Sequence, residues 1–240
     1  MKGLVVIPTY NERQTIEELI REVLETGLDL LVVDDNSPDG TAEKVKALAF
    51  EDSRIRLIQR PRKMGLGSAY REGFRFALSG DYEVIFEMDG DGSHRPKYLP
   101  RLLEALREAD VAIGSRYVKG VSVIDWPMAR LLLSYAANVF CRAVTGLPLH
   151  DTTAGFKGFK RGALEALELD RIRSEGYSFQ IEVNAILYRK GFRFKEIPII
   201  FEDRNVGVSK MNGSIVLEAI LLVFKLGWIR LFGPKGKKRA

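Results

Sequence analysis

The stretch VIFEMDGDGSH, residues 84–94, is an apolar run that leads directly into two aspartates. Its first half is rich in residues that favour a buried β-strand. Gly90 and Gly92 permit a tight turn where that strand ends. Asp89 and Asp91 lie two positions apart, so in extended backbone both side chains point to the same side. Two carboxylates placed in this way suit Mg²⁺ or Mn²⁺, although Asp-Gly pairs are also common in ordinary surface turns.

The rest of the first half alternates between short apolar runs and helical patterns. Apolar runs that predict further strands occupy residues 4–7, 30–33, 55–58 and 111–114. Apolar residues at helical spacing predict helices at residues 16–24, 41–48, 67–78 and 96–109. Repeated units of this kind indicate an α/β fold with a mainly parallel sheet and helices on both faces.

Each predicted strand is followed by a polar, turn-rich segment. These segments are residues 8–12, 34–41, 60–67, 89–94 and 115–117. Because ligands of open α/β sheets bind at the carboxyl ends of the strands, we expect the segments to meet at one edge. Asn11, Asp39 and Thr41 are also good residues for a helix start, so capping is an alternative role for each. The convergence favours a metal site over a plain turn at Asp89 and Asp91.

The composition narrows the class of protein without choosing a function. The chain has 240 residues with 46% hydrophobic content, which is ordinary for a globular protein with a sizeable core. The net charge of +5 suits an anionic partner. The basic residues do not form an aromatic-interleaved stripe, so no nucleic-acid partner is expected. A single cysteine, Cys141, excludes an internal disulfide and fits a reducing, cytoplasmic compartment.

The second half is less regular and ends in a strongly apolar segment. Residues 126–146 predict a helix or a broken pair, and residues 178–190 predict another helix. Residues 215–232 form an apolar helical pattern with only Glu218, Lys225 and Arg230 as charges, followed by a basic tail. This pattern predicts an amphipathic helix lying on an anionic membrane surface. Burial within the domain is the commoner alternative, and the central Lys225 argues against a simple membrane span.

Six motifs, taken in order, resemble glycosyltransferase family 2, and more narrowly its dolichol-phosphate (polyprenol-phosphate) mannose synthases. They are IPTYNE (7–12), VVDDNSPDGT (32–41), MGLGSA (64–69), MDGDGSH (88–94), GSRY (114–117) and TTAGF (152–156). The resemblance runs from residue 4 to about 211. It implies a GT-A fold, the Rossmann-like fold of nucleotide-diphospho-sugar transferases. It implies a catalytic domain at residues 1–211, with a nucleotide-sugar and metal half (1–117) and an acceptor half (118–211), before a C-terminal helix and tail (212–240).

The resemblance also implies roles for particular residues. Donor contacts are implied for Pro8, Tyr10, Glu12, Val33, Asp35, Asp89, Gly90, Asp91, Arg116, Arg204 and Lys210. Metal contacts are implied for Asp89 and Asp91, and for Ser93, which stands where many relatives carry Gln, as a direct ligand or through a water. Contacts to the acceptor phosphate are implied for Arg130 and Ser134. Asp91, Arg116 and Arg204 are the residues expected to support catalysis.

The expected reaction is metal-dependent transfer of mannose from GDP-mannose to dolichyl or polyprenyl phosphate, with inversion. A phosphate monoester has a second pKa near ~6, so the acceptor is already mostly dianionic at pH 7 and needs no strong general base. Transfer of glucose from UDP-glucose is an alternative, as is nucleotide-sugar binding at a membrane without turnover. We expect a peripheral protein on the cytoplasmic face of the membrane, with small membrane subunits as candidate partners.

Overall fold

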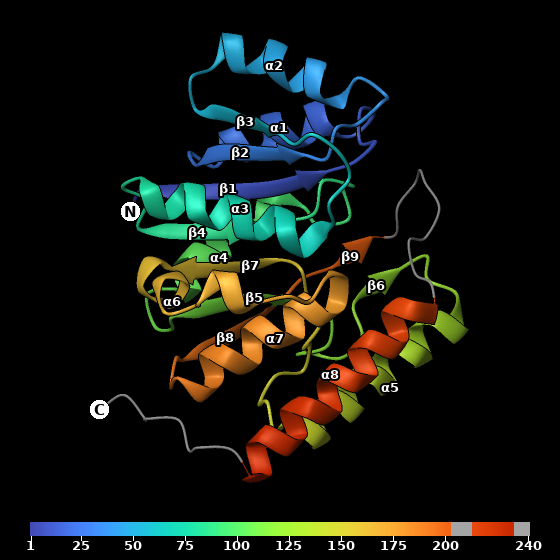
Figure 1. Cartoon of the computed structure of the whole chain (residues 1–240). Coiled ribbons are helices and arrows are strands. Elements are labelled where there is room, and N and C mark those ends of the chain that lie inside the picture. The colour runs from blue at the N-terminus through green and yellow to red at the C-terminus, as the bar shows by residue number, and fades with distance from the viewer. Residues whose placement is uncertain (203–212, 233–240) are drawn as a thin grey trace.

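The computed structural model describes residues 1–202 and 213–232, with side chains described from residue 217 onward in the second range. Its centre is a seven-stranded sheet in the order β3-β2-β1-β4-β7-β5-β8 (Figure 1). The strands are β1 (Gly3–Thr9), β2 (Asp29–Asp34), β3 (Ile55–Gln59), β4 (Val84–Glu87), β5 (Val111–Ser115), β7 (Lys157–Lys160) and β8 (Phe194–Pro198). All neighbours pair in parallel except β7, which runs antiparallel to β4 and β5.

Helices cover both faces of this sheet. In Figure 1, α3 (Leu66–Ser79), α6 (Arg161–Glu165) and α7 (Gly176–Arg189) lie in front of the sheet. On the other face lie α1 (Ile16–Glu25), α2 (Thr41–Glu51) and α4 (Leu99–Ala105), the last preceded by the 3₁₀ turn η1 (Pro96–Tyr98). A second 3₁₀ turn, η2, spans Leu169–Arg171, and a small two-stranded parallel sheet joins β6 (Val123–Ile124) to β9 (Phe201–Glu202).

The sheet divides the core into two clusters because successive side chains of a strand point to opposite faces. Leu4 and Val6 of β1 pack with side chains of α3, α6 and α7. Val5 and Ile7 of the same strand pack with side chains of α1, α2 and α4. All four side chains are fully buried, which explains why this strand reads as a continuous apolar run. The predicted α/β fold with a mainly parallel sheet is therefore confirmed.

The second half completes this sheet and adds two long helices. β7 and β8 enter the same sheet as the first five strands, and Pro198 lies in the edge strand β8, as its lack of a backbone N–H requires. Residues 126–146, predicted as a helix or a broken pair, form one helix, α5 (Met128–Thr145). The predicted helix at 96–109 is shorter, because it begins as η1 and its α-helical part ends at Ala105.

The C-terminal helix α8 (Gly213–Phe232) lies alongside α5 and packs on α7 (Figure 1). Val223 and Leu226 are buried in this contact, and a Cβ at Gly227 would come within 2.6 Å of the Val144 side chain of α5. Arg230 donates to the carbonyl oxygens of Ala143 and Val144, at 3.2 and 3.4 Å, and so caps the end of α5. Across residues 1–202 and 213–232, no helix combines the length and the apolar character that crossing a bilayer requires.

Candidate active site

The carboxyl ends of the central strands border one cleft of about 560 Å³. We call it the central cleft. Segments after β1, β2, β3, β4 and β5 all contribute to its lining, as the sequence predicted. The predicted site residues that line it are Pro8, Tyr10, Glu12, Asp35, Asp89, Gly90, Asp91, Arg116 and Arg130. Arg204 and Lys210 lie outside the described residues.

Asp89 and Asp91 lie in the turn that follows β4, and each is held by a named neighbour. Asp89 Oδ1 accepts a hydrogen bond of 3.1 Å from the Tyr70 hydroxyl, which reaches it from α3. Burial, reinforced by Asp89 and Glu87, raises the pKa of Tyr70, so its hydroxyl stays protonated and acts as a donor. The turn itself is fixed by Thr15, whose hydroxyl donates to the Gly90 carbonyl oxygen at 3.0 Å.

Ser93 contacts Asp91 directly. Its backbone N–H and its hydroxyl both donate to Asp91 Oδ1, at 3.0 and 2.6 Å. Ser93 is almost completely buried and is not among the residues that line the central cleft. In this arrangement the hydroxyl orients the carboxylate, and a direct metal contact through Ser93 stays a prediction. Among the described residues, no group of three or more His, Cys, Asp or Glu side chains is placed to hold a metal, so the fit rests on the two aspartates.

His94 packs against the same turn and is neutral. Its Nδ1 accepts a hydrogen bond of 3.2 Å from the Asp89 backbone N–H. Burial lowers the pKa of His94, and its ring stacks on Phe156 at a centroid distance of 5.1 Å. Because Nδ1 is an acceptor in the neutral ring, the proton resides on Nε2. That nitrogen therefore cannot take a proton from a substrate.

One end of the central cleft is built on a buried ion pair. Asp35 pairs with Arg60, and both side chains are almost fully buried. Asp35 Oδ2 also accepts hydrogen bonds from the backbone N–H groups of Met64 and Gly65, at 3.0 and 3.2 Å. Asp35 thus ties the segment after β2 to the segment after β3. At the same end, the Lys63 ammonium lies 4.1 Å from the centre of the Tyr10 ring.

Two predicted contact residues lie elsewhere than expected. The Val33 side chain is fully buried in the core on the face covered by α3 and α7, because the alternation of β2 directs it there. A donor contact at Val33 would have to come from its backbone, and it stays a prediction. Ser134 on α5 is outside the described lining of the cleft, and its hydroxyl accepts a hydrogen bond of 2.8 Å from Tyr117.

The opposite end of the cleft is basic, and its arginines are held by side chains. Arg116 makes a two-pronged ion pair with Asp151: Nε lies 2.7 Å from Oδ2, and Nη2 lies 2.6 Å from Oδ1. Nη2 also donates to the Thr153 hydroxyl at 2.9 Å. Both partners of the pair are buried. Burial opposes the charge, but the attraction of Asp151 outweighs it and raises the pKa of Arg116, so the guanidinium stays charged.

Arg130, the first of the two predicted acceptor contacts, is stacked on Trp126. The Arg130 guanidinium lies 4.2 Å from the centre of the Trp126 ring, and Arg116 lies 5.6 Å from it. Trp126 therefore contacts both guanidinium groups, and both of these cations line the cleft. Arg116 also lies 5.5 Å from the Phe201 ring, which closes this end from β9.

Sequence reasoning did not assign a role to several residues that build this cleft. They include Trp126, Asp151, Glu175, Tyr177 and Gln180. Glu175 accepts hydrogen bonds from the Gly67 and Ser68 backbone N–H groups at the start of α3, at 2.6 and 3.1 Å. Its contact is 107 positions away along the chain, so no local pattern announces it. Of these residues, Asp151 had the clearest signal in the sequence, because it directly precedes the TTAGF motif.

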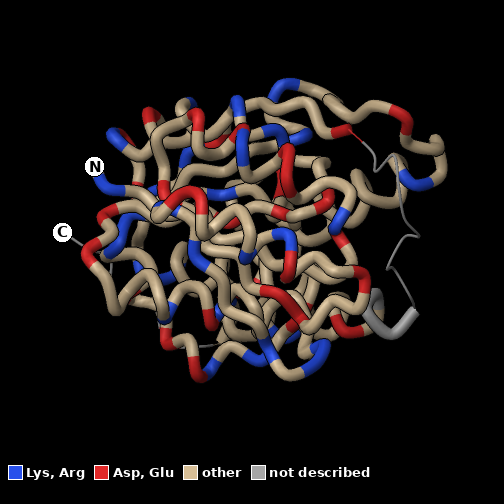
Figure 2. The backbone as a smooth tube through the Cα atoms, turned by 90° about the horizontal axis from the view of Figure 1, so that it is seen from above, with Lys and Arg blue, Asp and Glu red and all other residues tan. Residues whose placement is uncertain are grey.

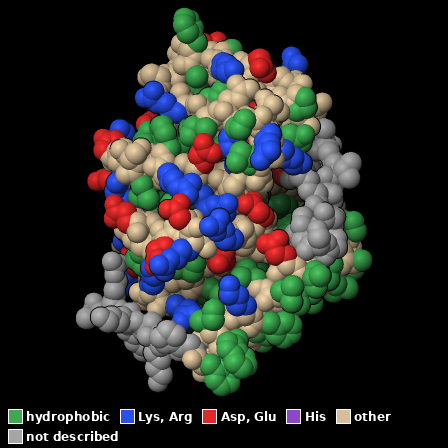
Figure 3. All heavy atoms as spheres, viewed as in Figure 1, with side chains coloured by type: hydrophobic (Ala, Val, Ile, Leu, Met, Phe, Trp, Pro, Cys, Tyr) green, Lys and Arg blue, Asp and Glu red, His purple; other side chains and the backbone are tan. Residues whose placement is uncertain are grey.

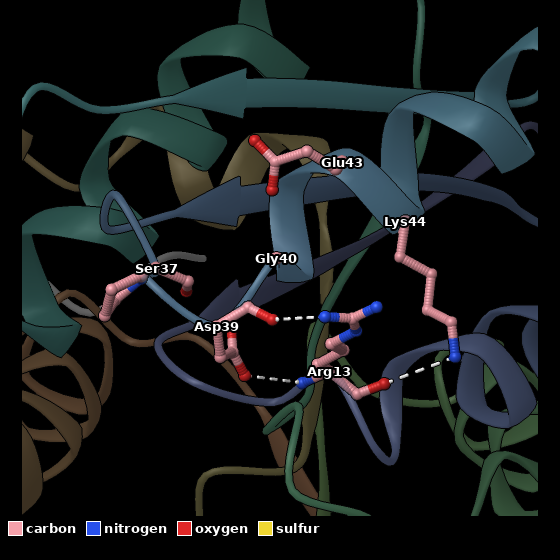
Figure 4. Close-up of a pocket in the computed structure, with 7 residues that line it drawn as sticks. Arg13, Ser37, Asp39, Gly40, Glu43 and Lys44 are labelled. Atoms are coloured by element: carbon pink, nitrogen blue, oxygen red, sulfur yellow. Dashed lines mark hydrogen bonds between the residues drawn. The ribbon is translucent and has the colours of Figure 1, made fainter.

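A second hollow lies outside the cleft, where the segments after β1 and β2 meet at the start of α2. Figure 4 shows it lined by Arg13, Ser37, Asp39, Gly40, Glu43 and Lys44. Arg13 donates to Asp39 from its backbone N–H at 3.1 Å and from Nη1 at 3.0 Å (Figure 4). Asp39 also accepts from the N–H of Thr41, the first residue of α2, at 3.0 Å. The N-cap residue of α2 is Gly40 and has no side-chain capping hydrogen bond, so Asp39 is not the N-cap.

The fold and the cleft define a class of protein: an α/β enzyme whose sheet edge presents a carboxylate pair facing a basic end. A family model described as glycosyl transferase family 2 matches residues 4–168. The chain belongs to glycosyl transferase family 2, which confirms the resemblance seen in the motifs and makes the protein a glycosyltransferase.

The relatives of known name are similar over nearly the whole chain. The chain is 46% identical to the undecaprenyl-phosphate mannosyltransferase of Micrococcus luteus, over 95% of this chain and 94% of that protein. It is 45% identical to the polyprenol monophosphomannose synthase of Mycolicibacterium smegmatis, over 94% and 87%. It is 37% identical to the dolichol-phosphate mannosyltransferase of Pyrococcus furiosus, over 94% and 64%.

Solved structures share the fold at lower identity. A mannosyltransferase from Pyrobaculum calidifontis, solved with GDP-mannose and Mn²⁺, has a TM-score of 0.62 and 19% identity, over 99% of this chain and 66% of that chain. Glucosyl-3-phosphoglycerate synthase from Mycobacterium tuberculosis, solved with Mn²⁺, UDP-glucose and phosphoglyceric acid, has a TM-score of 0.68 and 17% identity, over 94% and 79%. These likenesses confirm the predicted GT-A fold.

Proposed function

We propose that the protein transfers mannose from GDP-mannose to a polyprenyl phosphate with inversion at the sugar carbon. The support is threefold. Three relatives at 37% identity or more carry names of polyprenol-phosphate mannose synthases or mannosyltransferases. A structure of the same fold was solved with GDP-mannose and Mn²⁺. The observation that carries the proposal is the cleft itself, whose lining brings together two aspartates and the cations Arg116 and Arg130.

Each end of the cleft has a separate task in this reaction. Asp89 and Asp91 would hold a divalent cation, Mg²⁺ or Mn²⁺, which when bound neutralises the charge developing on the departing diphosphate. Arg116 and Arg130 would hold the acceptor phosphate close to the sugar against the repulsion of two anionic groups. An oxygen of the acceptor phosphate then forms the new bond to C1 of mannose, and the bond from C1 to the diphosphate breaks.

The partners of the acidic cleft residues agree with an acceptor that needs no general base. Glu175 is tied to the start of α3 and to Arg71, at 3.2 Å. Asp35 is tied to Arg60. His94 carries its proton on Nε2 and has a lowered pKa because it is buried. These groups are engaged in holding the cleft together, which suits a nucleophile that arrives already charged.

The lipid part of the acceptor would reach the cleft along α5 and α8. We call their exposed apolar side chains the apolar face; they are Leu132, Leu133, Tyr135, Val139, Phe140, Leu217, Ile220, Leu221, Phe224, Trp228, Leu231 and Phe232. Figure 3 shows hydrophobic side chains gathered along α8. Charged residues of both signs are interspersed along the rest of the chain (Figure 2). Because α5 also carries Arg130, a lipid phosphate could sit in the cleft while its chain stays in the bilayer.

The decisive experiment is a transfer assay with the purified protein, a short polyprenyl phosphate, Mn²⁺ or Mg²⁺, and either GDP-mannose or UDP-glucose. Transfer of mannose from GDP-mannose alone is the expected result. Transfer only from UDP-glucose would replace the proposed donor. No transfer from either donor would contradict the catalytic proposal and favour binding without turnover.

Membrane docking has its own test, sedimentation with anionic vesicles. The double variant Leu221→Glu/Trp228→Glu removes apolar area from exposed positions of α8 and should lose most vesicle binding. Phe50→Glu is the matched control, because Phe50 is 94% exposed on α2, away from α5 and α8 (Figure 1). Equal binding of both variants would exclude the apolar face as the docking surface and, with it, a peripheral position at the cytoplasmic face through α8.

A further inference from the structure

A buried polar cluster lies directly beneath the aspartate pair and is not explained by the roles given above. It consists of Glu87 on β4, Lys157 on β7 and Gln180 on α7. Glu87 and Lys157 are fully buried, and Gln180 is 2% exposed. The Lys157 ammonium lies 3.2 Å from Glu87 Oε1 and also donates a hydrogen bond to Gln180 Oε1. A buried ion pair is a costly arrangement unless its geometry is good, so a polar cluster here needs an explanation.

Lys157 determines which way the Gln180 amide faces. An ammonium group has only hydrogen-bond donors, so the amide atom next to it has to be the carbonyl oxygen. This chemistry fixes which atom of the amide is the oxygen and which is the nitrogen. The Gln180 NH₂ group, Nε2, is therefore directed away from Lys157.

Gln180 Nε2 is a buried donor without a hydrogen-bond partner among the described residues. Neither oxygen of the neighbouring Glu87 carboxylate makes a hydrogen bond of normal geometry to this amide. A buried N–H without an acceptor costs about 1–3 kcal/mol, so a ligand that supplies the acceptor is favoured.

The space next to Nε2 belongs to the central cleft. Gln180, Gly155 and Asp89 all line it. A Cβ on Gly155 would lie 3.4 Å from Asp89 Oδ2 and 3.7 Å from Gln180 Nε2. Because Gly155 has no side chain, a small space stays free between the Asp89 carboxylate, which would hold the cation, and the amide of Gln180. A group bound there lies next to the diphosphate of the donor, which is where the transferred sugar is attached.

We propose that Gln180 binds the transferred sugar, with Nε2 donating a hydrogen bond to one of its hydroxyl oxygens, and that Lys157 is the positioning residue that sets the amide. The inference rests on the proposed function, because the sugar is that of the donor. A hydroxyl suits this position better than a phosphate oxygen does. The Gln180 amide and the sugar are both neutral, and the Asp89 carboxylate would repel an anion bound beside it.

The experiment compares binding of GDP-mannose with binding of GDP, each with Mn²⁺, by calorimetry. Gln180→Met keeps the length of the side chain but removes the amide. The variant should weaken the binding of GDP-mannose by about 3- to 10-fold and leave the binding of GDP unchanged, because the amide contacts only the sugar. Gln59→Met, at an exposed position on β3, is the matched control and should change neither. Equal weakening of both ligands, or no change in either, would overturn the proposal.

Lys157 is tested through its coupling to Gln180. The double variant Glu87→Met/Lys157→Met removes both buried charges together, an exchange that folded proteins tolerate well. It should lose the same part of the sugar affinity as Gln180→Met, and adding Gln180→Met to it should cost nothing more. Additive losses would show that Lys157 does not position the amide. Circular dichroism of each variant separates these results from unfolding.

The wild-type protein decides the proposed function separately. Mannose transfer from GDP-mannose supports it, whatever the Gln180 variants do. If the wild type transfers glucose from UDP-glucose instead, the same comparison is made between UDP-glucose and UDP. A sugar-dependent loss in Gln180→Met then still supports the inference, and a loss that does not depend on the sugar overturns it.

Discussion

The two ends of the central cleft are built on different principles. At the proposed donor end, Asp89 and Asp91 follow a single buried strand, and part of their support is local: Ser93 and His94 lie within five positions of Asp89, while the Tyr70 hydroxyl reaches Asp89 from 19 positions away. At the acceptor end, Arg116 depends on Asp151, which is 35 positions away. The donor end thus holds carboxylates toward a ligand, whereas the acceptor end holds a cation that already has an anionic partner. Aspartate therefore has different tasks at the two ends. Asp89 and Asp91 would bind a ligand, whereas Asp151 holds Arg116 in place.

The sharpest test of this contrast is Asp91→Asn. It removes one negative charge from the donor end but preserves the side-chain shape and the acceptor oxygen for Ser93. Because the metal contribution to leaving-group stabilisation is worth several kcal/mol, kcat/KM should fall by about 10²- to 10³-fold while the unfolding free energy changes little. Steady-state transfer assays and urea unfolding measure the two quantities. Asp52→Asn, at the partly exposed C-cap of α2, is the control and should leave transfer unchanged.

A variant at Asp91 that retained more than a tenth of the wild-type rate would remove this residue from the metal site. Asp89 would then have to hold the cation with other oxygen ligands.

The corresponding change at the acceptor end is Asp151→Asn, and its main effect should be on stability. It leaves the buried Arg116 without its anionic partner, which typically costs about 3–5 kcal/mol of unfolding free energy at pH 7. Asp170→Asn breaks an exposed Arg–Asp pair with Arg75 and should cost less than about 1 kcal/mol. Urea unfolding of the three proteins makes the comparison.

The pH dependence of that difference has a definite sign. Burial raises the pKa of Asp151, but attraction to Arg116 outweighs it, and the net pKa lies below the usual 3.8. The unfolded chain therefore binds the proton first, and the stability from ionised Asp151 is present above 3.8 and is lost as the pH falls through the lower folded value. The gap between wild type and Asp151→Asn should be constant from pH 7 to 5 and should narrow below that range. A gap that widens in acid would contradict the ion-pair account.

The difference between the two ends also explains what could be predicted from the sequence. Asp89 and Asp91 were found because strand pattern, turn glycines and spacing all lie within one stretch, and the rule for strand ends placed Asp35 and Arg116 at the same edge. The motif that named Val33 did not say which face of the strand its side chain takes; that side chain lies in the core, and the predicted donor contact stays a prediction.

The supports at the acceptor end could not be predicted because they depend on tertiary packing. Asp151 reaches Arg116 only after β7 enters the sheet between β4 and β5 in antiparallel orientation. Nothing in the run of the first five strands indicates that insertion. Trp126 is similar: in the sequence it is only the first residue of the helix predicted at 126–146, and its contact with two guanidinium groups follows from the fold.

The smallest expected effect concerns this tryptophan. Trp126→Leu removes the ring under Arg130, a contact worth about 0.5–2 kcal/mol, so the KM for polyprenyl phosphate should rise by about 3- to 30-fold. The KM for GDP-mannose should stay the same, because the donor end has supports of its own. Trp126→Phe retains an aromatic face and should recover most of the acceptor affinity, which a merely space-filling role would not explain. A rise in the donor KM instead would show that the two ends are not independent, since a change under Arg130 would then reach the carboxylates through the ring cluster of Arg116, Phe201 and His94.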